Sequence, residues 1–220
     1  MSDQTTQDLE KKIRDIYDIL DTAHPEAGCA LNFSTPLELL IASILSAQCT
    51  DERVNTVTEE LFQKYTFASD YAQTDIEILE EEVHPTGFYR NKAKAIKDCT
   101  AALVDRFDGN VPDAMEDLVS LPGIGRKTAN LVRACAFQMP GIIVDTHVLR
   151  LSGRLGLSKQ KNADKVEMDL RGITPEDQWS RLSYLLIFHG RKLCKAKKPL
   201  CEKCPVTGLC VYYEGRNAAV

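Results

Sequence analysis

Two residues with reactive side chains, Lys127 and Asp145, each stand at the expected start of a helix. A lysine in the first turn of a helix meets an unfavourable helix dipole, and partial burial would push its amine toward the neutral, nucleophilic form. If the two helix starts converge, Asp145 can take a proton from that amine and stabilise the cation that forms at the attacked carbon. The alternatives are a solvated or phosphate-contacting Lys127, and an Asp145 that only caps its helix.

The segment around Lys127 reads Leu-Pro-Gly-Ile-Gly-Arg-Lys-Thr-Ala over residues 121–129 and predicts a glycine hairpin between two helices. Gly123 and Gly125 allow positive φ and carry no side chains, so another backbone, such as a sugar-phosphate chain, can come close. The N–H groups of the second helix, which begins near Arg126, would then hold a phosphate. The alternative is an ordinary tight turn between two packed helices.

Two further side chains are placed to reach into a cleft. Gln48 is the expected last residue of an apolar, buried helix for which Thr35 is the expected cap and Pro36 the first residue. Phe88 lies in the turn at residues 85–90, and an exposed aromatic ring can wedge between base pairs. The alternatives are a surface amide for Gln48 and a ring folded back onto the core for Phe88.

The length of 220 residues and a hydrophobic content of 44% predict a globular chain with one large or two modest domains. No apolar run approaches the ~18 residues of a membrane span. The polar, acidic N-terminus lacks the apolar region of a secretory signal. We therefore expect no membrane association and a cytoplasmic location.

The net charge of −5 argues against a generally basic nucleic-acid binder, but the charge is unevenly distributed. Residues 1–89 carry a net charge of −13, whereas residues 191–203 carry +5. The basic residues of that second segment are Arg191, Lys192, Lys195, Lys197, Lys198 and Lys203. A polyanion would therefore meet the C-terminal third of the chain, with the acidic part turned away.

Apolar residues recur at helical spacing along most of the chain. Leu9, Ile13, Ile16 and Leu20 form one such stripe near the N-terminus. Further helices are expected at residues 54–65, 74–83, 91–107, 146–155 and 162–170, and from a cap at Thr174 to a stop at Gly190. Since no alternating run is long enough for a sheet, the sequence predicts an all-α fold of nine or ten helices.

Four cysteines, Cys194, Cys201, Cys204 and Cys210, follow the pattern C-x6-C-x2-C-x5-C. Disulfide pairing is the alternative to metal binding, but the other four cysteines are scattered and no secretory signal is expected, which indicates a reducing compartment. A zinc ribbon normally has two C-x2-C pairs and this motif has one, so the spacing leans toward an iron-sulfur cluster and leaves the metal open. The basic residues beside the motif would present cations to phosphates.

The hairpin segment, the cysteine motif and three shorter segments together resemble one known family. The shorter segments are Leu-Ser-Ala-Gln at residues 45–48, Val-Asp-Thr-His at 144–147 and His-Gly-Arg at 189–191. These five segments, taken in their order along the chain, are similar to those of bacterial endonuclease III, a family of helix-hairpin-helix DNA glycosylases that excise oxidised pyrimidines. The resemblance covers almost the whole chain.

The resemblance implies a two-domain arrangement within the all-α class. A six-helix barrel module would span residues 29–139 and contain the hairpin. A discontinuous helical domain would join residues 1–28 to 140–220 around a 4Fe-4S cluster held by the four cysteines of the motif. Double-stranded DNA with damaged pyrimidines or abasic sites would lie across the interdomain cleft, bound by a monomer associated with the nucleoid.

The resemblance also implies a reaction. Lys127 would attack the sugar carbon of a flipped-out damaged nucleotide, and the resulting Schiff base would allow β-elimination of the 3′ phosphate, with Asp145 as the essential carboxylate. Gln48 would fill the vacated position in the base stack. Phe88 stands where relatives commonly have a leucine wedge, a departure that bears on opposite-base preference and lesion range.

The remaining expected contacts are with the DNA backbone. The full set of expected DNA-binding residues is Gln48, Phe88, Gly123, Gly125, Arg126, Thr128, His147, Arg150, Arg191, Lys195, Lys197 and Lys198. His147 and Arg150 would contact phosphates or act only as cap and surface residues.

Three other functions compete with this interpretation. They are a monofunctional adenine-excising glycosylase, a glycosylase for pyrimidine dimers or mismatches, and a non-catalytic iron-sulfur DNA-binding protein. The presence of Lys127 disfavours the first, and its presence together with Asp145 disfavours the last.

Overall fold

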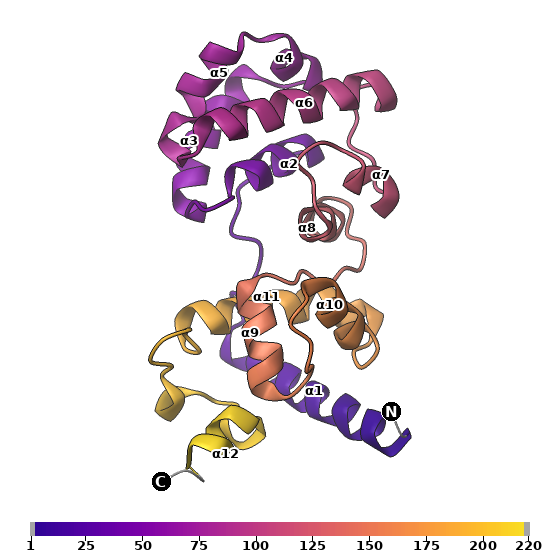
Figure 1. The fold of residues 1–220 in the computed structure, drawn as a ribbon, viewed down its shortest axis with the longest axis vertical. Helices are drawn as coiled ribbons and strands as arrows, with labels where there is room; N and C mark the ends of the chain where they lie inside the picture. The colour runs from indigo at the N-terminus through magenta and orange to yellow at the C-terminus, as the bar shows by residue number, and fades with distance from the viewer. Residues whose placement is uncertain (1–2, 218–220) are drawn as a thin grey trace. The chain divides into compact units, whose positions relative to one another are not determined.

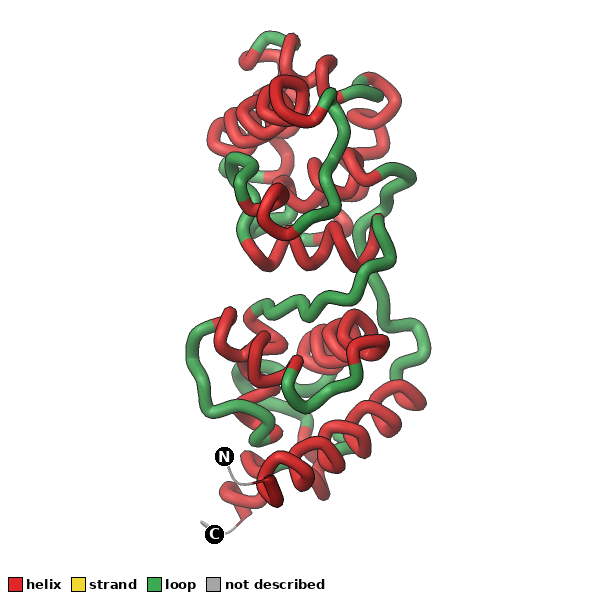
Figure 2. Tube along the Cα trace, turned by 90° about the vertical axis from the view of Figure 1, so that its right-hand side faces the viewer, coloured by secondary structure: helices red, strands yellow, loops and turns green. Residues whose placement is uncertain are grey.

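The computed structural model describes residues 3–217, which form two compact helical units (Figure 1). Unit 1 comprises Met1–Gly28 and Pro140–Val220, and unit 2 comprises Cys29–Met139. Among the described residues the chain contains helices and loops and no strand (Figure 2), which confirms the predicted all-α class. No helix in this part of the chain is long and apolar enough to cross a membrane.

Unit 2 is built around the buried helix α2. Its helices are α2 (Pro36–Leu45), α3 (Asp51–Lys64), α4 (Ala68–Gln73), α5 (Ile76–Val83), the 3-10 turn η1 (His84–Thr86), α6 (Tyr89–Phe107), α7 (Met115–Val119) and α8 (Arg126–Ala136). The Thr35 side chain caps α2 by accepting from the Glu38 N–H at 3.2 Å, and Pro36 is the first residue, as predicted. All residues from Leu39 to Leu45 are buried, and α3, α6 and α8 pack around them. This helix therefore positions the hairpin helix α8.

Unit 1 joins the first helix of the chain to the last third of the sequence. Its helices are α1 (Asp3–Ala23), α9 (Thr146–Leu155), α10 (Ala163–Arg171), η2 (Glu176–Gln178), α11 (Trp179–Lys192), η3 (Cys201–Lys203), η4 (Thr207–Leu209) and α12 (Val211–Asn217). The stripe of Ile13, Ile16 and Leu20 packs into a core that also contains apolar residues of α9 and α11. In Figure 1 the indigo helix α1 accordingly lies with the orange and yellow helices of the chain's end.

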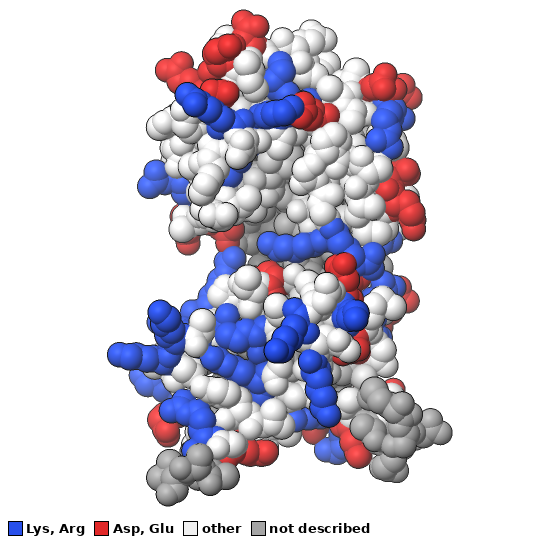
Figure 3. Space-filling model, in the orientation of Figure 1, with Lys and Arg blue, Asp and Glu red and all other residues white. Residues whose placement is uncertain are grey.

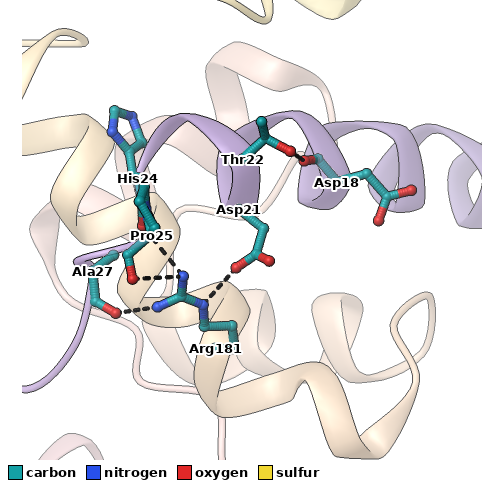
Figure 4. Close-up of polar contacts among 7 residues, drawn as sticks. All are labelled: Asp18, Asp21, Thr22, His24, Pro25, Ala27 and Arg181. Atoms are coloured by element: carbon teal, nitrogen blue, oxygen red, sulfur yellow. Dashed lines mark hydrogen bonds and ion pairs between the residues drawn. The ribbon is translucent and has the colours of Figure 1, made fainter.

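Arg181 of α11 fastens the end of α1 to this core (Figure 4). Its Nε donates to Asp21 Oδ1 at 2.7 Å, and one terminal nitrogen donates to the carbonyl oxygens of His24 at 3.2 Å and Pro25 at 3.3 Å. The other terminal nitrogen donates to the Ala27 carbonyl. A single guanidinium thus binds three carbonyls of the segment that directly follows α1.

Several sequence-based expectations about the elements were wrong in detail. The described residues hold twelve α-helices, not nine or ten, and unit 2 holds seven rather than six. Helices such as α4 and α7 span six and five residues, too few to show a repeating apolar pattern. Thr174 does not cap α11, which begins at Trp179 after a 3-10 turn and continues through Gly190 to Lys192. A short helix thus escapes the sequence pattern, and a helical glycine is not always a stop signal.

Candidate active site and cysteine loop

The predicted hairpin is present between α7 and α8 in unit 2. Gly123 has a φ of +78°, and a Cβ at this position would lie 3.3 Å from the Ala95 Cβ of α6, so glycine suits both the backbone and the close packing. Gly125 has a φ of −95°, so of the two glycines only Gly123 uses the positive φ that both allow. No atom would meet a Cβ at Gly125 within 4 Å, so its backbone lies open.

Lys127 lies in the first turn of α8, directly after this hairpin. The residue is exposed, and the partial burial considered from the sequence is not found. The reason is that α8 turns Ala129, Asn130 and Val132 toward the interior of unit 2, which leaves Lys127 on another face. Gly125, the residue before the helix, offers no side-chain cap.

Asp145 begins α9 in unit 1, as the sequence predicted. Its Oδ1 accepts hydrogen bonds from the backbone N–H groups of His147 and Val148, both at 2.8 Å. The preceding residues 142–144 are buried and deliver the half-buried carboxylate to the helix start. Because both bonds end at Oδ1, the helix cap does not use the second carboxylate oxygen, Oδ2.

Gln48 and Phe88 share an unusual backbone conformation in unit 2. Both are exposed, Phe88 by 62%, and their φ angles are +53° and +49°. Residues other than glycine rarely adopt this left-handed region, and those that do often sit at binding sites. The structure thus confirms that both side chains project from unit 2 rather than fold onto its core.

Arg150 of α9 serves the interior of unit 1. One terminal nitrogen donates to the carbonyl oxygens of Cys194 at 2.9 Å and Gly190 at 3.1 Å, and Nε donates to the Cys194 carbonyl at 3.2 Å. The same terminal nitrogen lies 3.1 Å from His147 Nδ1. The guanidinium of Arg150 thus holds the start of the cysteine loop, and its phosphate contact stays a prediction.

His147 stays half-buried beside this guanidinium. Burial lowers the pKa of His147, and the cations of Arg150 and Arg191 act in the same direction while Asp145 opposes them. The ring is therefore disposed to be neutral.

Arg154, one turn further along α9, holds the next part of the cysteine loop. One terminal nitrogen donates to Cys194 Sγ at 3.2 Å and to the Lys195 carbonyl at 2.8 Å, and the other donates to the Ala196 carbonyl at 3.0 Å. The Cys210 Sγ atom lies 3.4 Å from the Arg154 carbonyl oxygen. Helix α9 therefore positions both ends of the motif.

The four cysteine sulfurs of the motif lie close enough to influence one another. Burial raises the pKa of the Cys204 thiol, and the thiols of Cys194, Cys210 and Cys201 raise it further. Among the described residues no three His, Cys, Asp or Glu side chains are close enough to hold a single metal ion. In a four-iron cluster each thiolate binds a different iron, so the sulfurs stand further apart. A set of four thiols at one loop fits such a cluster.

Basic side chains surround this loop. Figure 3 shows Lys and Arg gathered over unit 1 in the lower part of the view. The basic residues of the loop segment, all of them exposed, are Arg191, Lys192, Lys195, Lys197, Lys198 and Lys203. This surface, which we call the basic loop, carries the cations that a polyanion would meet.

Sequence reasoning missed two buried polar residues, Lys92 and His189. Lys92 is 4% exposed although it is charged, and its position with Ile96, Cys99 and Leu103 on one face of α6 would have signalled this. His189 follows Leu182, Leu185 and Leu186 on the buried face of α11 in the same way.

The all-α fold, the glycine hairpin and the four-cysteine loop are the features expected of a helix-hairpin-helix DNA glycosylase. Comparison with known families agrees with this class of protein. Residues 41–176 match the family model of the HhH-GPD superfamily base excision DNA repair protein. Residues 194–210, from the first to the last cysteine of the motif, match the iron-sulfur binding domain of endonuclease III.

Individual relatives narrow this class. Endonuclease III of Synechocystis sp. is 49% identical over 91% of this chain and 92% of its own, and endonuclease III of Bacillus subtilis is 45% identical over 91% and 92%. A solved structure of a trapped endonuclease III–DNA covalent intermediate superposes with a TM-score of 0.90 at 44% identity, covering 94% of this chain and 98% of that one. The chain belongs to the endonuclease III family.

Family membership confirms the activity and the cofactor that the sequence predicted. The protein is a base-excision DNA repair enzyme, a DNA glycosylase with associated AP lyase activity that acts on DNA. It carries a 4Fe-4S cluster.

Proposed function

We propose that the enzyme excises oxidised pyrimidines from duplex DNA through a Schiff base on Lys127. The observation that carries this proposal is the exposed amine in the first turn of α8, directly after the hairpin. The relative trapped as a covalent endonuclease III–DNA intermediate supports an enzyme nucleophile. A lysine suits both steps of the reaction, whereas water could perform only the first.

The steps follow from amine chemistry. Lys127 Nζ attacks C1′ of the flipped-out nucleotide, the C1′–N bond breaks, and the base leaves with the bonding electrons and a proton. The sugar ring then opens to an iminium ion on Lys127. This cation makes the C2′ proton acidic, and its removal expels the 3′ phosphate by β-elimination.

Asp145 is the carboxylate that supports these steps. It takes a proton from the Lys127 amine and stabilises the positive charge that develops at C1′. The hydrogen bonds from His147 and Val148 fix its Oδ1, which leaves the position of the carboxylate set before DNA binds.

Gln48 and Phe88 maintain the duplex around the extruded nucleotide. The Gln48 amide fills the vacated position, and the Phe88 ring wedges into the stack where relatives commonly have leucine. Their exposed position and positive φ angles support this role, since both side chains project from unit 2.

The DNA backbone is held at two surfaces. At the hairpin, Gly123 and Gly125 admit a phosphate to the N–H groups at the start of α8, near Arg126 and Thr128. At the basic loop the phosphate-binding residues are Arg191, Lys195, Lys197 and Lys198, with His147 beside them.

Cys194, Cys201, Cys204 and Cys210 are the proposed cluster ligands. With four thiolates the cluster has no open coordination position, so its role is to hold the basic loop in shape. We assign the enzyme a monomeric state, double-stranded DNA with damaged pyrimidines or abasic sites as its partner, and a cytoplasmic, nucleoid-associated location because its substrate is DNA.

Base release and strand nicking on duplexes carrying oxidised pyrimidines, pyrimidine dimers or mismatches test the substrate. Borohydride trapping tests the nucleophile. We expect wild type to form a covalent adduct on oxidised pyrimidines, Lys127→Ala to form none, and the control Lys159→Ala, an exposed lysine of unit 1, to behave as wild type. An undiminished adduct with Lys127→Ala would overturn the assignment of Lys127 as the nucleophile. Preferential release of pyrimidine dimers would identify the enzyme as a pyrimidine-dimer glycosylase instead.

A further inference from the structure

Two buried histidines connect the N-terminal segment to the cysteine loop within unit 1. His24 Nε2 lies 3.0 Å from His189 Nδ1, and His189 Nε2 lies 3.4 Å from Cys204 Sγ. The two histidines are only 3% and 1% exposed. Three polar side chains from distant parts of the sequence thus form one continuous chain of hydrogen bonds.

The chemistry of Cys204 decides which atom donates and which accepts in each of these hydrogen bonds. A thiolate bound to iron can only accept a hydrogen bond, so His189 must carry its proton on Nε2. Both rings are buried, and a buried imidazole in its neutral form carries a single N–H. His189 Nδ1 is then an acceptor, and His24 must donate to it from Nε2.

We propose that His189 donates a hydrogen bond to the cluster-bound thiolate of Cys204 and that His24 is the positioning residue that fixes the tautomer of His189. The proposal rests on the assignment of Cys204 as a cluster ligand. A donor to a ligand sulfur stabilises the more negative, reduced cluster, so the pair raises the reduction potential. It also retains the cluster, as partners of metal ligands generally do.

The protein holds His24 rigidly for this role. Arg181 donates to the carbonyls of His24 and Pro25, which fixes the backbone on either side of the ring (Figure 4). On the ring itself, the centroid lies 5.3 Å from that of Phe188. Lys192 of α11 pairs with Glu26 at 3.2 Å, which adds a second tie between α11 and this segment. His24 therefore has little freedom to turn away from His189.

A purely packing role does not explain this arrangement. An apolar side chain would fill the same buried space without the desolvation penalty of a polar ring. The two ring nitrogens that face each other, and the one that faces sulfur, instead lie at hydrogen-bonding distances.

The test is the reduction potential of the full-length, cluster-loaded enzyme, measured by film voltammetry. We expect His189→Leu to shift the potential to more negative values and His24→Leu to shift it in the same direction by less. His24→Gln should stay near wild type because its amide N–H can still donate to His189 Nδ1. The matched control is His84→Leu, an exposed histidine of η1 in unit 2, which should cause no shift.

A second measurement is cluster loss in the presence of a chelator, followed by its visible absorbance. Removing a partner of a metal ligand typically weakens metal binding about 10–100-fold, and we expect faster loss for His189→Leu in that range. If His189→Leu assembles no cluster, the comparison of His24→Leu with His24→Gln still decides. Equal potentials in those two variants, or an unchanged potential in His189→Leu, would overturn the proposal.

Failure of this inference is distinguishable from failure of the proposed function. Iron content of Cys204→Ser tests the ligand assignment independently, and a full cluster in that variant would remove the premise. Borohydride trapping of the histidine variants tests the Lys127 chemistry, which the potential does not affect.

Discussion

The Nζ atom of Lys92 donates a 2.8 Å hydrogen bond to the carbonyl oxygen of Thr86, two residues before Phe88. Lys92 is buried in unit 2, and burial lowers its pKa while the neighbouring Cys49 raises it. Cys49 directly follows Gln48. A single buried amine is thus bonded to the turn that precedes Phe88 and interacts with the residue that follows Gln48.

Lys92→Met should leave the Thr86 carbonyl without its donor and loosen the turn that carries Phe88. We expect a loss of about 1–3 kcal/mol in the free energy of unfolding and slower single-turnover base release. Chemical denaturation and rapid-quench kinetics measure the two effects. The control is Lys94→Met on the same helix, an exposed lysine paired with Asp98, which should change stability by less than ~1 kcal/mol. Equal effects of the two substitutions would contradict a positioning role for Lys92.

Phe88→Ala should reduce base release without destabilising the fold, because the ring is 62% exposed. Loss of one stacked aromatic corresponds to about 1–3 kcal/mol in alanine substitutions, and we expect an effect of this size on kcat/KM. Phe88→Leu should retain most of the activity and alter the preference for the opposite base. Steady-state kinetics on duplexes with each opposite base, with thermal unfolding as the control, measure this. A large fall in Tm for Phe88→Ala would assign the ring to the core.

Asp145→Asn and Asp145→Ala separate the catalytic role of the carboxylate from its capping role. Asparagine is as good a cap as aspartate but carries no charge, so both variants should lose activity, on the order of 10²–10⁴-fold, and only Asp145→Ala should lose about 1 kcal/mol of stability. Nicking assays and denaturant unfolding provide the two readouts. Full activity in Asp145→Asn would reduce Asp145 to a helix cap.

Gly190→Ala should destabilise unit 1, because its Cβ would lie 2.9 Å from both Cβ and Nδ1 of His147. We expect a cost of about 1–3 kcal/mol from overpacking between α11 and α9. Gly153→Ala on α9 is the matched control, since nothing would lie within 4 Å of its Cβ, and it should stabilise by up to ~1 kcal/mol. Calorimetry of both variants compares the two effects. An unchanged stability of Gly190→Ala would show that α11 and α9 can move apart without any cost in the free energy of unfolding.

The features that could be predicted from the sequence are those encoded locally. Thr35 with Pro36 marked the start of α2, and Asp145 marked the start of α9, because capping depends on neighbouring residues. The all-α class followed from helical periodicity. The cysteine motif indicated the cluster because its four ligands lie in one short loop.

The features that could not be predicted depend on tertiary contacts. His24 and His189 are 165 positions apart, and the sequence near either residue does not predict their contact. The exposure of Lys127 depends on which face of α8 packs inward, and the role of Arg150 depends on where the cysteine loop passes. Such pairings are decided by packing, which the local pattern does not encode.

The bond between Asp21 and Arg181 spans 160 positions of the chain, and this imposes an order on synthesis. At ~5–20 residues per second, α1 leaves the ribosome roughly 8–32 s before the arginine that fastens it. Unit 2 is a single continuous segment of the sequence, so its hydrophobic core can form during that interval. The first helix made must therefore wait, with its apolar stripe unburied, for nearly the whole chain to follow.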